Sequence, residues 1–168
     1  LRSWAGQRNL SPILVMGLIR QESRFEAEIL SRSGAVGLMQ IMPDTGRWIA
    51  SKKGRSNYSL KDPENNIEFG TWYFDYTHRE FNDNSMLAIA SYNAGPGAIG
   101  RWVKSRGIGD PDEFVEGIPY DETRGYVYRV FGNYWNYQLL YSPQIRQRIA
   151  QLESETITAS SRTKGANK

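Results

Sequence analysis

Glu22 is the side chain whose position best suits acid–base chemistry. It ends an apolar stretch, residues 13–19, that follows the helix-start pair Ser11-Pro12. The dipole at a helix C-terminus opposes ionisation of a carboxylate there, and burial opposes it further, so we expect a raised pKa. A carboxyl group that stays protonated near neutral pH is what a general acid for glycoside cleavage requires. The alternative is an exposed glutamate that pairs with Arg20 or Arg24 to little effect.

No second carboxylate accompanies Glu22 along the chain. An ordinary glycosidase needs two carboxyl groups at a defined separation, but the next acids, Glu26 and Glu28, lie beyond the expected end of the helix. This absence suits a mechanism in which one carboxyl group acts alone. Asp44 and Glu122 are both still free to approach Glu22 in space.

Two further segments combine glycines with side chains that could hold a ligand. Residues 34–43 are apolar and glycine-rich around one amide, Gln40, which can donate and accept hydrogen bonds. Glycines there would let the backbone approach a ligand closely, or would form a tight turn packed under the core, which we favour. In residues 91–97, the ring of Tyr92 can pack while its hydroxyl points at a carboxylate. Asn93 either contributes to a site or caps the helix end.

Several kinds of site are excluded or disfavoured by composition. The chain has no cysteine and one histidine, His78, which removes thiol nucleophiles, Cys-ligated metals and sites that need two imidazoles. We expect His78 at the core edge or surface, and we expect no metal and no cofactor. Residues 95–100 match the G-x-G-x-x-G pattern of dinucleotide sites, but they follow a helix instead of a strand, so we reject that interpretation.

Helix-start residues and apolar spacing predict one compact all-α domain. Ser11-Pro12 and Asp62-Pro63 each join a capping side chain to a proline at the first helical position. A very small β element is expected near residues 31–42, and residues 107–119 are expected to be loop-rich. The expected helices cover about residues 12–23, 43–52, 63–81, 86–94, 96–103 and 122–141.

The basic character of the chain resides in its C-terminal part. Of 168 residues, the first 142 carry 16 basic and 16 acidic side chains, so the formal net charge of +3 comes from residues 143–168. We expect a globular domain at 1–142 and a basic tail at 143–168 that begins as a helix and then is disordered. Such a tail could bind nucleic acid, but we favour a solvated tail without that partner. A first residue other than Met suggests a fragment of a longer protein, and the longest apolar run, residues 13–19, is too short to span a membrane.

Four motifs in order resemble one family. Glu22-Ser23, residues 37–43, residues 92–97 and residues 118–127 are similar to the catalytic domain of soluble lytic transglycosylases. These belong to the goose-lysozyme-like group, glycoside hydrolase family 23. The resemblance covers about residues 4–142 and implies a lysozyme-like helical fold with a glycan-binding groove.

The resemblance also implies an activity and a set of site residues. The substrate would be the β-1,4 bond between N-acetylmuramic acid and N-acetylglucosamine in peptidoglycan, and Glu22 would be the single acid/base. It would protonate the glycosidic oxygen and then deprotonate the muramic-acid 6-hydroxyl, which attacks C1 to leave a 1,6-anhydro end. Ser91 stands where the family often has Ala, and Arg24-Phe25 also depart from the pattern. By position, the implied substrate-binding residues are Ser23, Ser31, Gln40, Met42, Tyr92, Asn93 and Glu122.

The resemblance further suggests a monomeric part of a longer chain, associated with the periplasm or cell envelope of a bacterium. Two alternatives to this function stay open. One is a lysozyme-type hydrolase that uses Glu22 with water as the nucleophile. The other is a peptidoglycan-binding module without turnover, against which the intact Glu22, Gln40 and Tyr92 argue.

Overall fold

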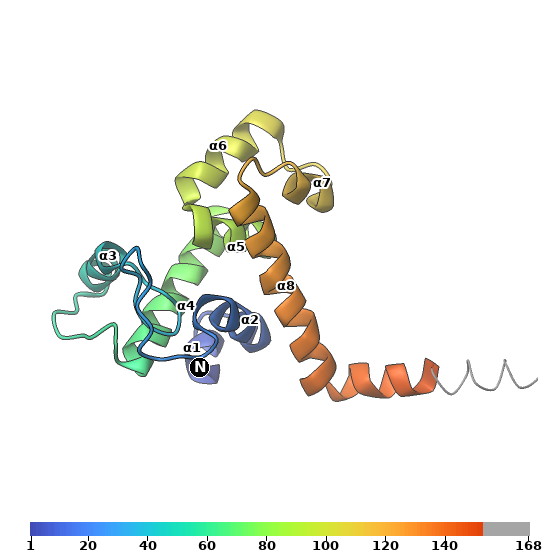
Figure 1. Ribbon diagram of the computed structural model, residues 1–168, viewed down its shortest axis with the longest axis horizontal. Coiled ribbons are helices and arrows are strands. Elements are labelled where there is room, and N and C mark those ends of the chain that lie inside the picture. Colours follow the sequence, from blue (N-terminus) through green and yellow to red (C-terminus); the bar gives the residue numbers. More distant parts are fainter. Residues whose placement is uncertain (153–168) are drawn as a thin grey trace, which may run out of the picture. The chain divides into compact units, whose positions relative to one another are not determined.

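The computed structural model describes residues 1–152, apart from the side chains of residues 111 and 112. In that part of the chain the regular elements are helices, joined by loops (Figure 1). The predicted all-α class is therefore confirmed. The helices are α1 (Arg2–Gly6), α2 (Pro12–Ser23), α3 (Pro43–Lys53), α4 (Pro63–Glu80), α5 (Ser85–Ala94), α6 (Pro96–Arg106), α7 (Pro111–Glu116) and α8 (Asp121–Tyr141), followed by helical residues 143–152.

The chain divides into two compact units, residues 1–134 and 135–168. This division falls inside α8, earlier than the expected boundary after residue 142. Residues 143–152 are helical. The disorder expected further along the tail falls on residues 153–168, which lie outside the described part of the chain. Within residues 1–152, no helix is both long enough and apolar enough to cross a membrane.

The helices α2 and α4 begin at the capping side chains that the sequence predicts. Ser11 Oγ accepts a hydrogen bond from the Leu14 amide at 3.4 Å, and Asp62 Oδ1 accepts one from the Asn65 amide at 2.8 Å. These bonds satisfy donors that the first turn of a helix leaves unpaired. Before α5, Asn84 Oδ1 does the same for the amides of the first turn. The expected starts of α2 and α4 are thus confirmed by their caps.

Two short helices were not predicted, α1 and α7. Residues 107–119 were expected to be loop-rich because of their glycines, yet α7 occupies Pro111–Glu116. Its start repeats the signature of α2 and α4, since Asp110 Oδ1 accepts from the Glu113 amide at 3.4 Å ahead of Pro111. The cap from Asp110 and the proline after it therefore start a helix in spite of the glycines nearby. The expectation of a loop at this position was wrong.

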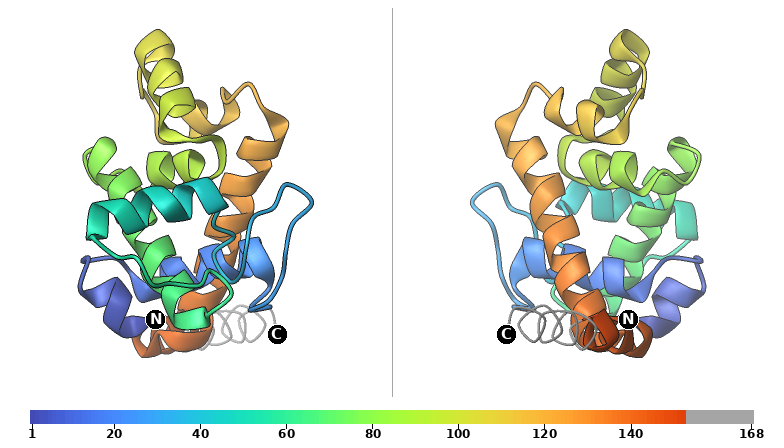
Figure 2. Two further views of the ribbon diagram at one scale, coloured as in Figure 1. Left: turned by 90° about the vertical axis from the view of Figure 1, so that its left-hand side faces the viewer. Right: turned by 90° about the vertical axis from the view of Figure 1, so that its right-hand side faces the viewer.

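The core of residues 1–134 is built around α2, α4 and α5. α5 packs between α4 and α6 (Figure 2), and Leu18, Phe69 and Phe74 are fully buried. The predicted β element is confirmed only as two isolated antiparallel bridges, Leu30 with Val36 and Val36 with Ile41. His78 lies buried at the end of α4, with Nδ1 at 2.9 Å from the Phe74 carbonyl oxygen and Nε2 at 3.1 Å from Ser85 Oγ.

α2 crosses the backbone of α8 closely, and this crossing brings the end of α2 to a fixed place on α8. A Cβ on Gly17 would lie 3.1 Å from the Val130 carbonyl oxygen and 3.2 Å from the Tyr134 amide nitrogen. Asn133 Nδ2 donates to the Gly17 carbonyl at 3.2 Å. One and a half turns further along α2 lies Glu22.

Candidate functional site

Glu22 is half-buried on the last turn of α2, where its Oε1 accepts a hydrogen bond from the Tyr126 hydroxyl of α8. Burial raises the pKa of Glu22 from its ordinary 4.5 to about 7, against the lowering effect of the Tyr126 hydrogen bond. Among the described residues Glu22 forms no ion pair with Arg20, Arg24 or any other cation. The geometry therefore supports the buried, protonatable carboxyl group instead of the exposed ion pair.

Ser23 ends α2 directly after Glu22. The residue is 2% exposed, and its hydroxyl donates to the Ile19 carbonyl at 3.1 Å and accepts from the Phe25 amide at 3.1 Å. The next two residues, Arg24 and Phe25, adopt left-handed backbone conformations that turn the chain away. Since both hydrogen bonds of Ser23 are local, the hydroxyl holds the end of the helix that carries Glu22.

Tyr126 is a site residue that the sequence reasoning missed. It is 3% exposed, and burial together with the charge of Glu22 raises its pKa well above 10, so its hydroxyl keeps its proton and donates. Its position in the motif of residues 118–127, three residues after the buried Thr123, marks it as inward-facing. The sequence pattern does not predict that this face of α8 packs against the end of α2.

Tyr92 lies near Glu22, but its hydroxyl has another partner. The charge of Glu22 contributes to the rise in the Tyr92 pKa, after burial as the main cause. The hydroxyl donates to the Met39 carbonyl at 2.8 Å, whereas a carboxylate was the expected partner. Its ring packs edge-on against Tyr73 and Phe74, with centroids 5.4 and 6.0 Å apart. Tyr92 thus ties α5 to the glycine-rich loop beside Glu22.

That loop is clamped to α4 by a buried asparagine, Asn66. Its Oδ1 accepts from the Met39 amide at 2.7 Å, and its Nδ2 donates to the carbonyls of Val36 and Leu60 at 2.8 and 2.7 Å. One side chain in the core of the protein therefore satisfies three backbone groups of two different loops. Such a buried amide holds its loops in one conformation because each unmade bond would be costly.

The glycines of the loop serve this packing. Gly37 has φ +75°, and a Cβ there would lie 2.4 Å from Asn66 Nδ2 and 2.7 Å from the Leu60 carbonyl oxygen. On the facing helix, a Cβ on Gly70 would lie 2.3 Å from Met39 Sδ. Of the two interpretations offered for these glycines, the turn packed under the core describes Gly37. The close approach is to the protein's own backbone and Asn66.

The three predicted residues of this loop have different surroundings. Gln40 has φ +46°, and its Nε2 donates to the carbonyls of Gly37 at 2.9 Å and Ile29 at 3.3 Å. Ser31 Oγ accepts from the Ala35 amide at 2.9 Å and lies 3.0 Å from Ser33 Oγ, inside its own turn. Met42 is 42% exposed at the start of α3.

Asn93 and Glu122 are brought together at a hollow of about 590 Å³. Thr123 Oγ1 donates to Asn93 Oδ1 at 2.7 Å and so joins the end of α5 to the start of α8. Thr123 lies one helical turn from Tyr126, so this hollow and Glu22 share the same face of α8. We call it the α6–α8 hollow. Its lining residues are Asn93, Ala94, Ala98, Arg101, Pro119, Tyr120, Asp121, Glu122 and Thr123.

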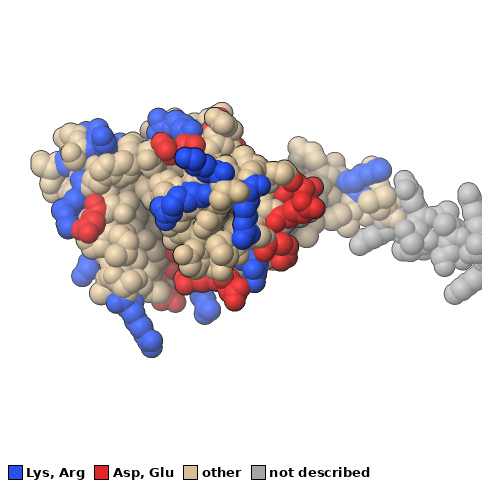
Figure 3. Space-filling view, turned by 90° about the horizontal axis from the view of Figure 1, so that it is seen from above, with Lys and Arg blue, Asp and Glu red and all other residues tan. Residues whose placement is uncertain are grey.

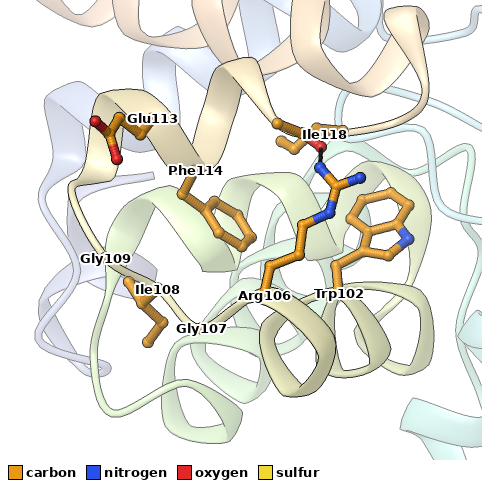
Figure 4. Close-up of a pocket in the computed structure, with 9 residues that line it drawn as sticks. Trp102, Arg106, Gly107, Ile108, Gly109, Glu113, Phe114 and Ile118 are labelled. Carbon is orange, nitrogen blue, oxygen red and sulfur yellow. Dashed lines mark hydrogen bonds between the residues drawn. The ribbon is translucent and has the colours of Figure 1, made fainter.

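A smaller pocket of about 150 Å³ lies between α6 and α7 (Figure 4). There the Arg106 guanidinium donates to the Gly117 carbonyl, and Phe114 and Ile118 supply apolar walls. None of the predicted site residues lines this pocket. Within the described residues no group of three or more His, Cys, Asp or Glu side chains could hold a metal ion.

Comparison with known proteins identifies a family and several relatives of this chain. The family described as the transglycosylase SLT domain matches residues 1–115. The soluble lytic murein transglycosylase of Escherichia coli strain K12 is 43% identical over 129 residues, which are 73% of this chain and 20% of that protein. The chain thus spans about a fifth of the length of that curated relative.

Two solved structures share the fold. The 70-kDa soluble lytic transglycosylase of Escherichia coli superposes with a TM-score of 0.79 at 36% identity, covering 84% of this chain and 24% of that one. An inactive mutant of lytic transglycosylase Slt from Pseudomonas aeruginosa, with glutamine in place of a glutamate, superposes with a TM-score of 0.76 at 38% identity, covering 81% and 23%.

Proposed function

The chain belongs to the transglycosylase SLT domain family, and from that premise we propose that it is a peptidoglycan lytic transglycosylase. It cleaves the β-1,4 bond between N-acetylmuramic acid and N-acetylglucosamine without consuming water and leaves 1,6-anhydromuramoyl ends. The observation that carries this proposal is the half-buried Glu22, whose pKa of about 7 keeps a large fraction protonated at neutral pH.

Glu22 acts first as the general acid. Because the Tyr126 hydroxyl donates to Oε1, that oxygen is the acceptor of the pair, and the acidic proton resides on Oε2. From Oε2 the proton passes to the glycosidic oxygen as the bond to C1 breaks. The resulting carboxylate is stabilised by the Tyr126 hydrogen bond, since a donated hydrogen bond favours the charged form.

In the second step the Glu22 carboxylate acts as the general base. It accepts the proton of the muramic-acid 6-hydroxyl, whose oxygen attacks C1 to close the 1,6-anhydro ring. Glu22 is thereby protonated again and ready for the next turnover. Proton balance within the cycle is complete without water or a second acid.

The electrostatics of Glu22 support a single carboxylate. The causes of its raised pKa are burial and the Tyr126 hydrogen bond, and no other carboxylate among the described residues contributes. A glycosidase with two carboxyl groups places them roughly 5–9.5 Å apart, a distance at which like charge would raise the pKa further. Asp44 and Glu122 therefore do not act as partners of Glu22 in this proposal, and this disfavours the lysozyme-type alternative.

The other predicted residues form the glycan groove and its frame. Met42, Gln40 and Ser31 from the loop before α3, and Asn93 and Glu122 at the α6–α8 hollow, line the path of the strand. Ser23 and Tyr92 act as positioning residues, the first on the end of α2 and the second on the loop that carries Gln40. The protein that contains this chain works in the periplasm or cell envelope, where its substrate is found, as a monomer and as part of a longer chain.

Mass analysis of the muropeptides released from purified peptidoglycan tests the proposal. Products lighter by one water than reducing-end muropeptides are expected. Reducing-end products would instead establish a lysozyme-type hydrolase, and binding to peptidoglycan without any product would point to a binding module. Incubation in ¹⁸O-labelled water separates the two enzymes again, because only the hydrolase places ¹⁸O at the new end.

A further inference from the structure

The C-terminal unit, residues 135–168, exposes apolar side chains that the proposed catalysis does not use. A group of exposed large apolar residues marks an interaction surface. In the described part of this unit, each at least 38% exposed, they are Trp135, Leu139, Leu140, Tyr141, Ile149 and Leu152. The family match ends at residue 115 and so does not include this surface.

Residues 143–152 of this unit form a helix that begins at its own cap. Ser142 Oγ accepts a hydrogen bond from the Ile145 amide at 3.4 Å, and Pro143 takes the first helical position. A helix of about ten residues is only marginally stable by itself in water. Since Ile149 and Leu152 are exposed on it, a surface that covers them would stabilise this helix.

The apolar and basic side chains of this helix have amphipathic spacing. Ile145, Ile149 and Leu152 are four and three positions apart, so they share one face, which we call the apolar stripe. Arg146 and Arg148 flank the stripe on its two sides. An arginine in such a place lays its alkyl part along an apolar surface and extends its guanidinium to polar groups beside it.

Charge separates this unit from the rest of the chain. Residues 1–134 contain 16 basic and 16 acidic side chains, whereas residues 135–168 contain five basic and two acidic ones, which gives the whole formal net charge of +3. Residues 135–152 contain no acidic side chain. Figure 3 shows basic (blue) and uncharged (tan) atoms on the segment that adjoins the grey residues. A negatively charged partner therefore complements this surface.

Among negatively charged partners, a phospholipid bilayer matches both properties of this surface. Isoleucine and leucine side chains enter the acyl boundary, tryptophan and tyrosine rings favour the headgroup level, and arginines bind lipid phosphates. A soluble polyanion such as a nucleic acid would contact the arginines but leave the apolar stripe in water.

We propose that residues 135–152 bind the surface of an anionic phospholipid bilayer, with the helix of residues 143–152 lying among the headgroups. The apolar stripe faces the acyl chains, and Arg146 and Arg148 bind phosphates along the two edges of the helix. This contact tethers residues 1–134 to a membrane. It does not involve Glu22, so its test is independent of the proposed function.

Flotation of the full chain with vesicles tests the proposal. Phosphatidylcholine vesicles that contain about one-quarter phosphatidylglycerol should bind it at least about tenfold more tightly than phosphatidylcholine alone, and less so at high salt. Ile149→Ser should weaken binding to the anionic vesicles about tenfold, because an apolar side chain is lost from the stripe. Arg146→Gln should weaken it about fivefold. Both side chains are exposed, so the fold should persist in both variants.

Two control variants remove the same kinds of side chain from residues 1–134. Ile108→Ser removes an isoleucine that is 41% exposed, and Lys52→Gln removes an exposed cation. Both should bind the vesicles as the wild type does. Equal losses in the controls, or no binding to anionic vesicles, would overturn the proposal. So would salt-sensitive binding that Ile149→Ser leaves unchanged, as for a soluble polyanion, or a dimer without vesicle binding that Ile149→Ser abolishes, as for a second copy of this chain.

A fluorescent label tests how the helix lies. The chain has no cysteine, so Ile149→Cys and Gln147→Cys each carry one nitrobenzoxadiazole label at a known place. Position 149 is in the apolar stripe, and position 147 is on the opposite face of the helix. On anionic vesicles only the label at 149 should shift its emission to shorter wavelength and resist an aqueous quencher. Equal behaviour of the two labels would overturn the proposed orientation and with it the role of the apolar stripe.

Discussion

The Tyr126 hydroxyl donates a hydrogen bond to Oε1 of Glu22 across 104 positions of the chain. The bond joins the last turn of α2 to the first turns of α8, between the half-buried Glu22 and the buried Tyr126. Burial raises the pKa of Glu22 and so favours the protonated carboxyl group, whereas the hydrogen bond from Tyr126 lowers that pKa. The balance between these two effects sets the protonation state on which the proposed chemistry depends.

Replacing Glu22 by Gln should abolish turnover and leave the fold intact. Glutamine is nearly isosteric and still accepts from Tyr126 through its own Oε1, but it has no proton to donate. We expect the rate of 1,6-anhydromuropeptide release to fall by at least about 10³-fold, as for loss of an essential general acid. Circular dichroism should match the wild type. Residual activity within tenfold of wild type would contradict the assignment of Glu22.

The rate should fall as pH rises through about 7. Glu22 must be protonated for the first step, and its pKa is raised to about 7, so the protonated fraction declines above that value. An ordinary glutamate would lose its proton near 4.3. The measurement is kcat/KM against pH between 4 and 9. A decline already complete by pH 5 would show that the carboxyl group is not held protonated.

Tyr126→Phe should move this decline to higher pH. The lost hydrogen bond favoured the carboxylate, so the pKa of Glu22 should rise by about one unit, and kcat should fall because Oε2 is no longer fixed. Tyr128→Phe is the matched control, since it removes another tyrosine–glutamate hydrogen bond of α8, to Glu116 at 2.7 Å and on an exposed surface. Its profile should follow the wild type. Equal shifts in both variants would argue against a specific role for Tyr126.

Glu22 should make the folded protein less stable as pH rises. Below pH 4.5 the carboxyl group is protonated in both the folded and unfolded states, so its ionisation does not affect the free energy of unfolding. Between about 4.5 and 7 the unfolded chain releases the proton and the folded one keeps it, so the free energy of unfolding decreases. At pH 8 the penalty is about 3 kcal/mol. Urea unfolding should therefore find Glu22→Gln more stable than wild type at pH 8, with the difference vanishing near pH 4.

Gly37→Ala should destabilise the protein more than Gly34→Ala. Both glycines belong to the same loop and have positive φ, +75° and +89°, so both variants strain the backbone. A Cβ on Gly34 meets nothing within 4 Å, whereas on Gly37 it would collide with Asn66 and the Leu60 carbonyl. We expect Gly37→Ala to cost about 2 kcal/mol more in the free energy of unfolding. Equal costs would mean that Asn66 and the Leu60 carbonyl move easily to accommodate the added Cβ.

Ser91→Ala should stabilise the protein, and Ser23→Ala should destabilise it. Both serines are buried, but Ser91 Oγ has no hydrogen-bond partner among the described residues, whereas Ser23 Oγ has two. Removing an unsatisfied buried hydroxyl recovers its desolvation cost, about 1 kcal/mol or more. Thermal unfolding at one pH compares the two. A loss of stability in Ser91→Ala would reveal a partner for that hydroxyl.

Local chemistry along the chain was sufficient to predict most helices. Caps and prolines at Ser11-Pro12 and Asp62-Pro63 act within one turn, so their effect can be derived without the rest of the fold. The capping residue Asp110 before Pro111 also indicates the start of α7, but the neighbouring glycines led us to expect a loop there. Glu22 could be singled out for a related reason, because its helix end and its apolar neighbours are both visible in the sequence.

Contacts between distant segments were decided by the tertiary structure alone. Tyr126 and Asn66 look like ordinary helix residues until α8 meets α2 and α4 meets the loop of residues 34–42. Likewise, the charge of Glu22 contributes to the raised pKa of Tyr92, but the Tyr92 hydroxyl donates to the Met39 carbonyl and not to a carboxylate. The sequence by itself determined most of the helices, the candidate acid and the family resemblance, since short-range caps, spacing and ordered motifs encode them. Only the packed fold decided which groups bury and orient that acid and shift its pKa, because those contacts depend on how helices far apart in the chain come together.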